Sequence, residues 1–289
     1  MSYQLFTDAT ADLTEEMLRG LPAVIVIPME VEIDGQSYAY GPGGTITSAE
    51  FYAMQRQGKF ASTSQINPRV YYDAFEPVLR QGKDILYFCF SSGLSGTYQS
   101  AQIAIRDLKE KYPDRVVEIV DTRCASVGEG FLVREALIRQ RAGMSLIELA
   151  LWADDFRHYV CHWFTVDVFD HLKHGGRVSS TTAVFGTMLQ IKPFLHVDAK
   201  GKLELAGKPR GRRKAMDLQI EQMEKGWLLQ LTQQVVIGHC GCPEVAEQLK
   251  GELLQRFPSA EVYISEIGPV IGAHTGPGTL ALIYCGDNR

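Results

Sequence analysis

Apolar runs of strand length alternate with amphipathic stretches along the whole chain. Residues 84–90 form a continuous apolar run rich in aromatic side chains, and similar runs occur at 3–7, 24–31, 116–120, 160–166, 233–239, 262–265 and 280–285. A run without polar alternation is typical of a strand that is buried on both faces of a parallel sheet. Between the runs, apolar residues recur at helical spacing. This order predicts an α/β fold whose N-terminal part has a mainly parallel sheet flanked by helices.

The segment that follows residues 84–90 is a candidate anion-binding loop. It reads Ser91-Ser-Gly-Leu-Ser-Gly96 and leads into a helix expected over 97–108. Backbone N–H groups, hydroxyls and the positive end of the helix dipole meet in such a loop, and together they suit a carboxylate. The alternative is that Ser95 or Thr97 only caps the helix.

Several expected strands end in polar loops of this kind. Residues 8–12, 91–97 and 121–126 are such loops, and we expect the polar segment 60–65 to be a loop that joins them. Ligands of open α/β sheets bind outside the carboxyl ends of the strands, where these loops would meet. Convergence of four loops favours a binding site over capping alone.

The second half of the chain has a different organisation. The sequence changes in character near 143–160, and we predict two α/β domains, over 1–157 and 158–289. In the second domain we expect a mixed sheet, a helix that reaches Met188 and Leu189, a hairpin near 198–205 and a Gly/Pro loop over 270–280.

Composition and charge exclude several classes of protein. A formal net charge of −5 gives no reason to expect a nucleic-acid partner. There is neither a signal peptide at the start nor an apolar run of about 20 residues, so we expect no membrane segment. The 6 scattered cysteines suit reduced thiols in a cytoplasmic protein. Cys240-Gly-Cys242 beside His239 has no second ligand pair at a matching spacing, so we expect no metal site.

Sequence signatures of catalysis are weak. The chain has no phosphate-binding GxxxxGK[ST] motif, and Ser95 does not stand in a GxSxG nucleophile elbow. The residue types of a Ser–His–Asp triad are nevertheless available in Ser95, His274 and either Asp8 or Asp121. A Ser/His-dependent acyl hydrolase is therefore the alternative to a non-catalytic binding protein.

Eight motifs in order along the chain carry a resemblance to a known family. They span 8–13, 63–65, 91–101, 121–130, 172–179, 191–193, 208–211 and 274–278. They include Thr63-Ser-Gln, Ser91-Ser-Gly-Leu-Ser-Gly-Thr and His274-Thr-Gly-Pro-Gly. On these motifs the chain resembles the DegV family over essentially its whole length. One departure is Ala9, where the family more often has Ser.

The resemblance implies a fatty-acid-binding protein without catalytic residues or cofactor. Its ligand, held between the two domains, would be a long-chain fatty acid such as palmitate, stearate or oleate. By motif, the carboxylate would be held by Thr63, Ser95 and His274. The neighbouring candidates for the carboxylate are Ser64, Ser92, Gly96 and Thr275.

The acyl chain would need an apolar tunnel, and a partner would need a surface. Candidate tunnel residues are Phe164, Phe169, Phe185, Met188, Leu189, Ile191 and Ile271, for which ordinary core packing is the alternative.

The resemblance also implies a separate fatty acid kinase that forms an acyl phosphate for phospholipid synthesis. Arg177, Lys208 and Arg210 are candidate contacts for that kinase, and a solvated loop is the alternative for the last two.

Overall fold

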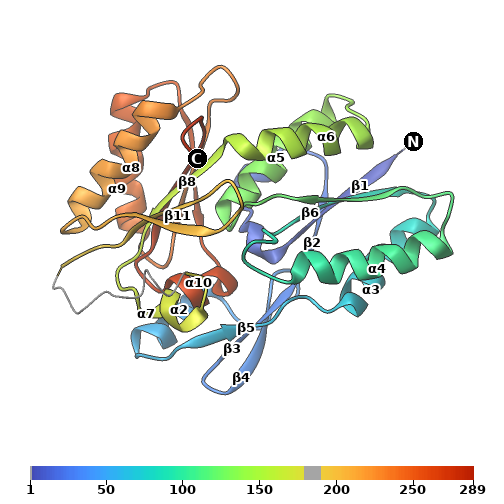
Figure 1. Ribbon diagram of the computed structural model, residues 1–289, viewed down its shortest axis with the longest axis horizontal. Helices are drawn as coiled ribbons and strands as arrows, with labels where there is room; N and C mark the ends of the chain where they lie inside the picture. Colours follow the sequence, from blue (N-terminus) through green and yellow to red (C-terminus); the bar gives the residue numbers. More distant parts are fainter. Residues whose placement is uncertain (1, 179–189) are drawn as a thin grey trace.

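The computed structural model describes residues 2–178 and 190–289, which contain three β-sheets (Figure 1). The first sheet is parallel throughout, with the strand order β2-β1-β6-β7. Its strands are β1 (Tyr3–Asp8), β2 (Val24–Ile27), β6 (Asp84–Cys89) and β7 (Val117–Asp121). This confirms the predicted parallel sheet, and it brings the loops after β1, β6 and β7 to one edge.

The central strand β6 is buried on both faces, as its continuous apolar run predicted. Ile85 and Tyr87 pack in a core with helices α3 and α4, whereas Leu86 and Phe88 pack in another with α5 and α6. Figure 1 shows the two helix pairs on opposite sides of the sheet. The bounds are α3 (Pro68–Arg80), α4 (Thr97–Lys111), α5 (Val127–Arg141) and α6 (Leu146–Phe156).

The second sheet is mixed, as predicted, with the order β10-β9-β8-β13-β11-β12. Its strands are β8 (Val160–Thr165), β9 (Phe194–Val197), β10 (Leu203–Gly207), β11 (Gln234–His239), β12 (Glu261–Glu266) and β13 (Leu280–Cys285). Helices α8 (Arg212–Gly226) and α9 (Pro243–Arg256) cover one face. Helix α5 packs against the other face, because Val236 and Ile283 share a core with Phe131. Helix α5 therefore lies between the two large sheets.

A small antiparallel sheet, β4-β3-β5, was not predicted. It consists of β3 (Met29–Ile33), β4 (Gln36–Tyr40) and β5 (Ala61–Thr63). Near it lie α2 (Ser48–Arg56), α7 (Asp170–Gly175) and α10 (Pro269–Thr275), of which the last two come from the second half of the chain. Helix α10 contacts β3, β5 and α2, so it joins the two halves of the molecule.

Three expectations about local structure were wrong. The single strand expected at 24–31 is divided at Pro28, because proline has no N–H to donate to a ladder, and β2 and β3 join different sheets. The loop expected at 60–65 contains β5, whose partner β3 lies about 30 positions earlier. The Gly/Pro loop expected at 270–280 begins with helix α10, for which Pro269 supplies a favourable first residue.

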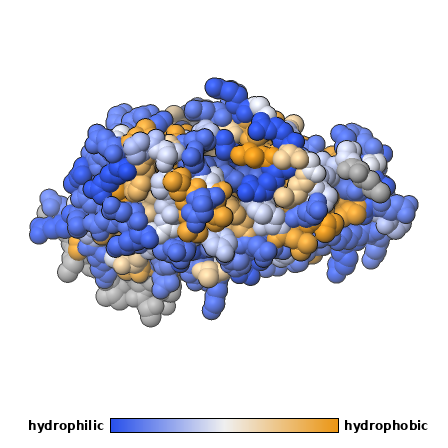
Figure 2. Space-filling view, turned by 90° about the horizontal axis from the view of Figure 1, so that it is seen from above, coloured by the Kyte–Doolittle hydropathy of each residue, from blue (hydrophilic) through white to orange (hydrophobic). Residues whose placement is uncertain are grey.

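Other features complete the fold. Short helices are η1 (Ala9–Ala11), α1 (Glu15–Leu18) and η2 (Arg157–Tyr159). The domain boundary predicted at 157/158 falls within η2, and the division into two domains stays a prediction. The helix expected to reach Met188 and Leu189 lies outside the described residues. None of the helices in the described ranges combines the length and the apolar character needed to cross a bilayer. The face of the molecule in Figure 2 is mostly polar, with apolar side chains in several separate groups.

Candidate functional site

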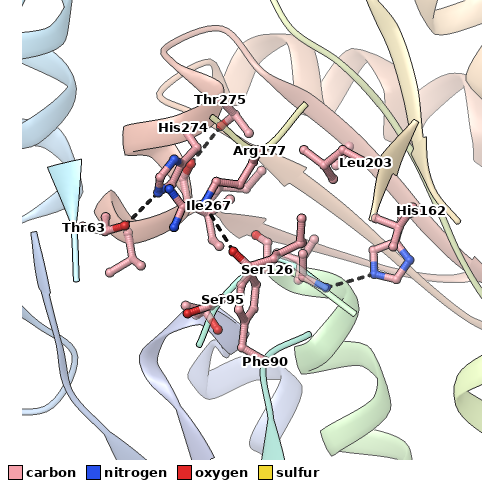
Figure 3. Close-up of a pocket in the computed structure, with 18 of the residues that line it drawn as sticks. Thr63, Phe90, Ser95, Ser126, His162, Arg177, Leu203, Ile267, His274 and Thr275 are labelled. Atoms are coloured by element: carbon pink, nitrogen blue, oxygen red, sulfur yellow. Dashed lines mark hydrogen bonds between the residues drawn. The ribbon is translucent and has the colours of Figure 1, made fainter. Parts of the chain in front are cut away.

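A pocket of about 850 Å³, including its mouth, lies where the three sheets meet. Its lining comes from both halves of the chain: Thr10, Met29, Thr63, Ser64, Gln65, Phe90, Leu94, Ser95, Ala125, Ser126, Val127, His162, Phe164, Arg177, Val197, Leu203, Ile267, Val270, Ile271, His274, Thr275, Thr279, Ala281 and Ile283. Most of these side chains are apolar, and Figure 3 shows several of the polar ones.

One end of the pocket carries a group of hydrogen-bonding side chains. Thr63 at the end of β5 and His274 in the last turn of α10 are joined by a contact of 2.7 Å between Oγ1 and Nε2. Ser95 lies before α4, where its Oγ accepts a hydrogen bond from the Thr97 N–H and lies 2.8 Å from Thr97 Oγ1. Ser95 therefore holds the first residue of α4 from outside the helix, whereas the N-cap itself is Gly96 without a side-chain cap, and Ser95 also lines the pocket.

The tautomer of His274 follows from its surroundings. Burial, followed by the charge of Arg177 and the effect of His174, lowers the pKa of His274 to about 4, so the imidazole is neutral at pH 7. Its Nδ1 faces the backbone of Gly175, where an added Cβ would lie only 2.1 Å away, and it has no hydrogen-bond partner among the described protein atoms. We assign the proton to Nε2, which then donates to Thr63 Oγ1 and leaves the unpartnered Nδ1 without a hydrogen.

This assignment leaves one hydroxyl proton free for a ligand. Since Thr63 Oγ1 accepts from His274, its own O–H is available to donate into the pocket. A hydroxyl aimed in this way suits an acceptor such as a carboxylate oxygen.

Arg177 adds a positive charge at the same end. Its Nε donates to the Leu94 carbonyl at 3.2 Å and one Nη to the Gly175 carbonyl at 2.6 Å. In the described part of the chain it forms no salt bridge, so its charge is not neutralised by a protein carboxylate. An anion at the polar end would supply the missing negative charge.

Among the described residues the opposite wall is mainly apolar, and the His162 ring there has its hydrogen bonds satisfied. His162 on β8 is buried, with Nδ1 3.0 Å from the Val160 carbonyl and Nε2 accepting from the Ala125 N–H at 3.3 Å. Burial, with a smaller contribution from Arg289, lowers the pKa of His162 well below its usual range, so the ring is neutral. Next to Phe164 it therefore presents carbon atoms rather than a charge to the pocket.

A buried carboxyl network lies beneath the lining residue Thr10. Asp8 accepts from the N–H groups of Thr10 and Phe90, while Glu129 lies 2.8 Å from Thr7 Oγ1 and 2.9 Å from Thr10 Oγ1. Thr10 Oγ1 also contacts Asp8 Oδ1. Because a hydroxyl has only one proton, Thr10 can donate to only one of the two carboxyl groups. Burial and the proximity of Asp8 raise the pKa of Glu129 well above its usual range. Glu129 is therefore the protonated partner, which donates to a threonine oxygen.

Comparisons with known proteins agree with this architecture. A family model described as "Uncharacterised protein, DegV family" matches residues 2–287. The chain belongs to the DegV family. A DegV domain-containing protein of Clostridium perfringens is 41% identical over 287 residues, which are 99% of this chain and 98% of the relative.

Solved DegV structures share the fold over their full length. A DegV family protein from Thermus thermophilus, described as binding fatty acid, is 30% identical and has a TM-score of 0.85, covering 99% of this chain and 100% of its own. The Streptococcus pneumoniae Fatty Acid Kinase (Fak) B3 protein, loaded with linoleic acid, has a TM-score of 0.86 at 20% identity, covering 99% of each chain. At that identity the likeness shows a common fold.

Half of the residues predicted to bind the ligand line the pocket. The carboxylate candidates found there are Thr63, Ser64, Ser95, His274 and Thr275, and the acyl-chain candidates are Phe164 and Ile271. Arg177, which was predicted as a contact for the kinase, also lines the pocket. Their roles in binding stay predictions.

Other predicted residues lie elsewhere. Ser92 is held by Asp121 at 2.6 Å, and Gly96 packs against Gln65, where an added Cβ would clash with the amide oxygen. Phe169 is part of the core, and Ile191 forms a bridge with the exposed Arg210. Lys208 is also exposed. Phe185, Met188 and Leu189 lie outside the described residues.

Sequence reasoning missed much of the lining. Thr10 and Ser126 stand in the polar loops that were expected to converge, so the sequence indicated that both residues lie near the site. His162, Leu203 and Ile283 are strand residues that face the pocket only because of sheet packing. No pattern in the sequence distinguishes them from ordinary core.

The geometry gives little support to the hydrolase alternative. Ser95 contacts Thr97, and His274 contacts Thr63, so the Ser–His hydrogen bond of a triad is not formed. Asp121 instead binds Ser92. Within the described ranges, no three His, Cys, Asp or Glu side chains are grouped as metal ligands.

Proposed function

We propose that this protein binds one long-chain fatty acid in the pocket. The carboxylate contacts Thr63, Ser95 and Arg177 at the polar end, and the acyl chain lies along the apolar wall. The observation that carries the proposal is the polarity of the pocket: Thr63, His274 and Arg177 lie together on one side of it, and His162 and Leu203 lie on the other side (Figure 3). A fatty acid has the same distribution of polar and apolar groups.

The energetics favour such a ligand. Burying each methylene contributes about 0.8 kcal/mol, so a chain of about 16 carbons offsets the ordering costs of binding. A carboxylate is well satisfied by hydroxyl donors and a guanidinium, even when it is half-buried. The DegV protein from Thermus thermophilus is described as binding fatty acid, which supports the same ligand class here.

We further propose that the bound acid is presented to a separate fatty acid kinase, whose acyl phosphate product feeds phospholipid synthesis. Ser64 is exposed and Thr63 and Ser95 are half-buried, so the polar end lies near the surface, where another protein can reach it. The sequence motifs and the fold shared with the Fak B3 protein support this role. The exposed side chains of Lys208 and Arg210 remain candidate contacts for the kinase.

Mass spectrometry of the purified protein tests the binding proposal. Under native conditions we expect the mass of the chain plus one fatty acid, and under denaturing conditions the chain alone. Delipidated protein that takes up neither palmitate nor oleate would refute the proposal.

The kinase step has its own test. Loaded protein is mixed with a bacterial fatty acid kinase catalytic protein, ATP and Mg²⁺, and acyl phosphate is trapped with hydroxylamine. We expect acyl hydroxamate in amounts that depend on the loaded protein. Fatty acid binding without any hydroxamate would refute the kinase role and leave the binding proposal intact.

A further inference from the structure

Asp12 lies outside the pocket, yet its contacts reach all three sheets. Its Oδ2 accepts from Ser126 Oγ at 2.6 Å, and its Oδ1 accepts from the Gly268 N–H at 3.0 Å and from Tyr40 Oη at 3.3 Å. Its carbonyl accepts from Ser265 Oγ at 2.5 Å. Asp12 follows β1 of the first sheet, Tyr40 ends β4 of the small sheet, and Ser265 belongs to β12 of the mixed sheet.

Two of these contacts position the walls of the pocket. Ser126 lines the pocket and precedes α5, the helix between the two large sheets. Gly268 precedes α10, which contributes Ile271, His274 and Thr275 to the lining. The backbone of Gly268 also packs on the Tyr40 ring, since an added Cβ would lie 2.2 Å from Cζ.

The backbone at this junction is strained. Asp12 has φ 47° and ψ 41°, and Ser126 has φ 54° and ψ −139°, although neither residue is glycine. Residues keep such conformations only where surrounding contacts impose them, and they gather at functional sites. The hydrogen bond between Asp12 and Ser126 joins two strained residues.

We propose that Asp12 is a positioning residue: by holding Ser126, Gly268 and Tyr40 on one carboxylate, it fixes α5 and α10 around the ligand. This inference rests on the proposed fatty acid binding, because retention of the ligand is its readout. Asp12 itself is not among the residues that line the pocket. Hydrogen bonds to a charged acceptor are about twice as strong as those to a neutral one, so the charge of the carboxylate matters.

The titratable groups that face Asp12 are acidic or phenolic. They are Asp8 before η1, Glu129 on α5, Tyr40 on β4 and Tyr52 on α2. In the described part of the chain, Asp12 makes no salt bridge. Burial, opposed by its hydrogen bonds and reinforced by Asp8, raises the pKa of Asp12 from 3.8 to about 7. The carboxyl therefore gains a proton as pH falls below neutrality, and the three contacts weaken.

Stability and retention should respond to pH in opposite directions. A carboxyl whose pKa is higher in the folded than in the unfolded state binds more protons when folded. Its contribution to stability is therefore largest below pH 3.8 and is lost as pH rises to about 7. Ligand retention, in contrast, should improve as Asp12 becomes charged. A residue with only a structural role would change both properties in the same direction.

The test compares the wild type, Asp12→Asn and the control Glu32→Gln, which alters an exposed carboxylate on β3. Each protein is loaded with cis-parinaric acid, and its release to excess albumin is followed by fluorescence between pH 6 and pH 8. We expect the wild type and the control to release faster at pH 6. Asp12→Asn should release about tenfold faster than the wild type at pH 8 and show a flat pH profile.

Ser126→Ala and Tyr40→Phe each remove one donor and keep the carboxylate, and both should accelerate release. They decide the question if Asp12→Asn does not fold, since wild-type release rates in both would overturn the proposal. A folded Asp12→Asn with the wild-type rate and pH profile would also overturn it. A wild type that binds no cis-parinaric acid would instead refute the proposed function, and this inference with it.

Discussion

Thr63→Val removes one hydroxyl from the polar end of the pocket and keeps the shape of the side chain. If Thr63 donates to a bound carboxylate, the variant loses a hydrogen bond to a charged acceptor, which contributes about 1.5–3 kcal/mol. Because about 1.4 kcal/mol corresponds to a factor of ten, we expect the Kd for oleate to rise about 10- to 100-fold. The fold should be retained because valine fills the same space as threonine, although the His274 Nε2–H loses its acceptor in the variant.

The assay is displacement of cis-parinaric acid, with oleate and oleyl alcohol as competitors. The alcohol keeps the acyl chain and lacks the charge, so Thr63→Val should weaken its binding less than that of oleate. The matched control is Ser62→Ala, because Ser62 is the exposed neighbour of Thr63 on β5. Equal losses for acid and alcohol, or no loss for oleate, would refute the reasoning about the Thr63 proton.

Three further predictions concern groups near the pocket. The pKa of His274 is lowered to about 4 by burial first, so folded-state stability should fall as pH decreases from about 6.5 to 4, and His274→Asn should flatten this part of a urea-unfolding pH profile. Glu129→Gln should keep the free energy of unfolding at pH 7 within about 1 kcal/mol, because an amide replaces a neutral acid. Glu129→Ala should lower the free energy of unfolding by about 2 kcal/mol or more. Equal losses of unfolding free energy in the two variants would show that Glu129 is charged. Gly175→Ala should displace His274 and weaken oleate binding at least about tenfold, whereas Gly251→Ala, with open space around it on α9, should leave binding unchanged in the same displacement assay.

Local patterns were sufficient to predict the parallel sheet and its polar edge. The apolar run at 84–90, the Ser/Gly loop and the apolar helix spacing after it correspond to β6, the loop before α4, and α4 itself. Such features depend on the burial of neighbouring residues, which the sequence displays directly. The convergence of the loops at 8–12, 91–97 and 121–126 also followed, because adjacent parallel strands end at one edge.

The composition of the site was less accessible from the sequence. The pairing of Thr63 with His274 spans 211 positions, and only the motif resemblance placed the two residues together. Helix α10 and strand β5 were expected as loops. Both are stabilised by packing between the halves of the chain, and no local periodicity records such packing.

The sequence by itself therefore determined most strands and helices of the two large sheets, and which strand ends carry polar groups, because short-range burial patterns and turn chemistry encode both. Only the tertiary structure decided which buried residues face the pocket rather than ordinary core. It also decided that Asp12 lies at the junction of three sheets. Those outcomes depend on how the sheets pack across helices α5 and α10, and that packing energy is a sum over contacts between distant segments rather than a property of any one of them.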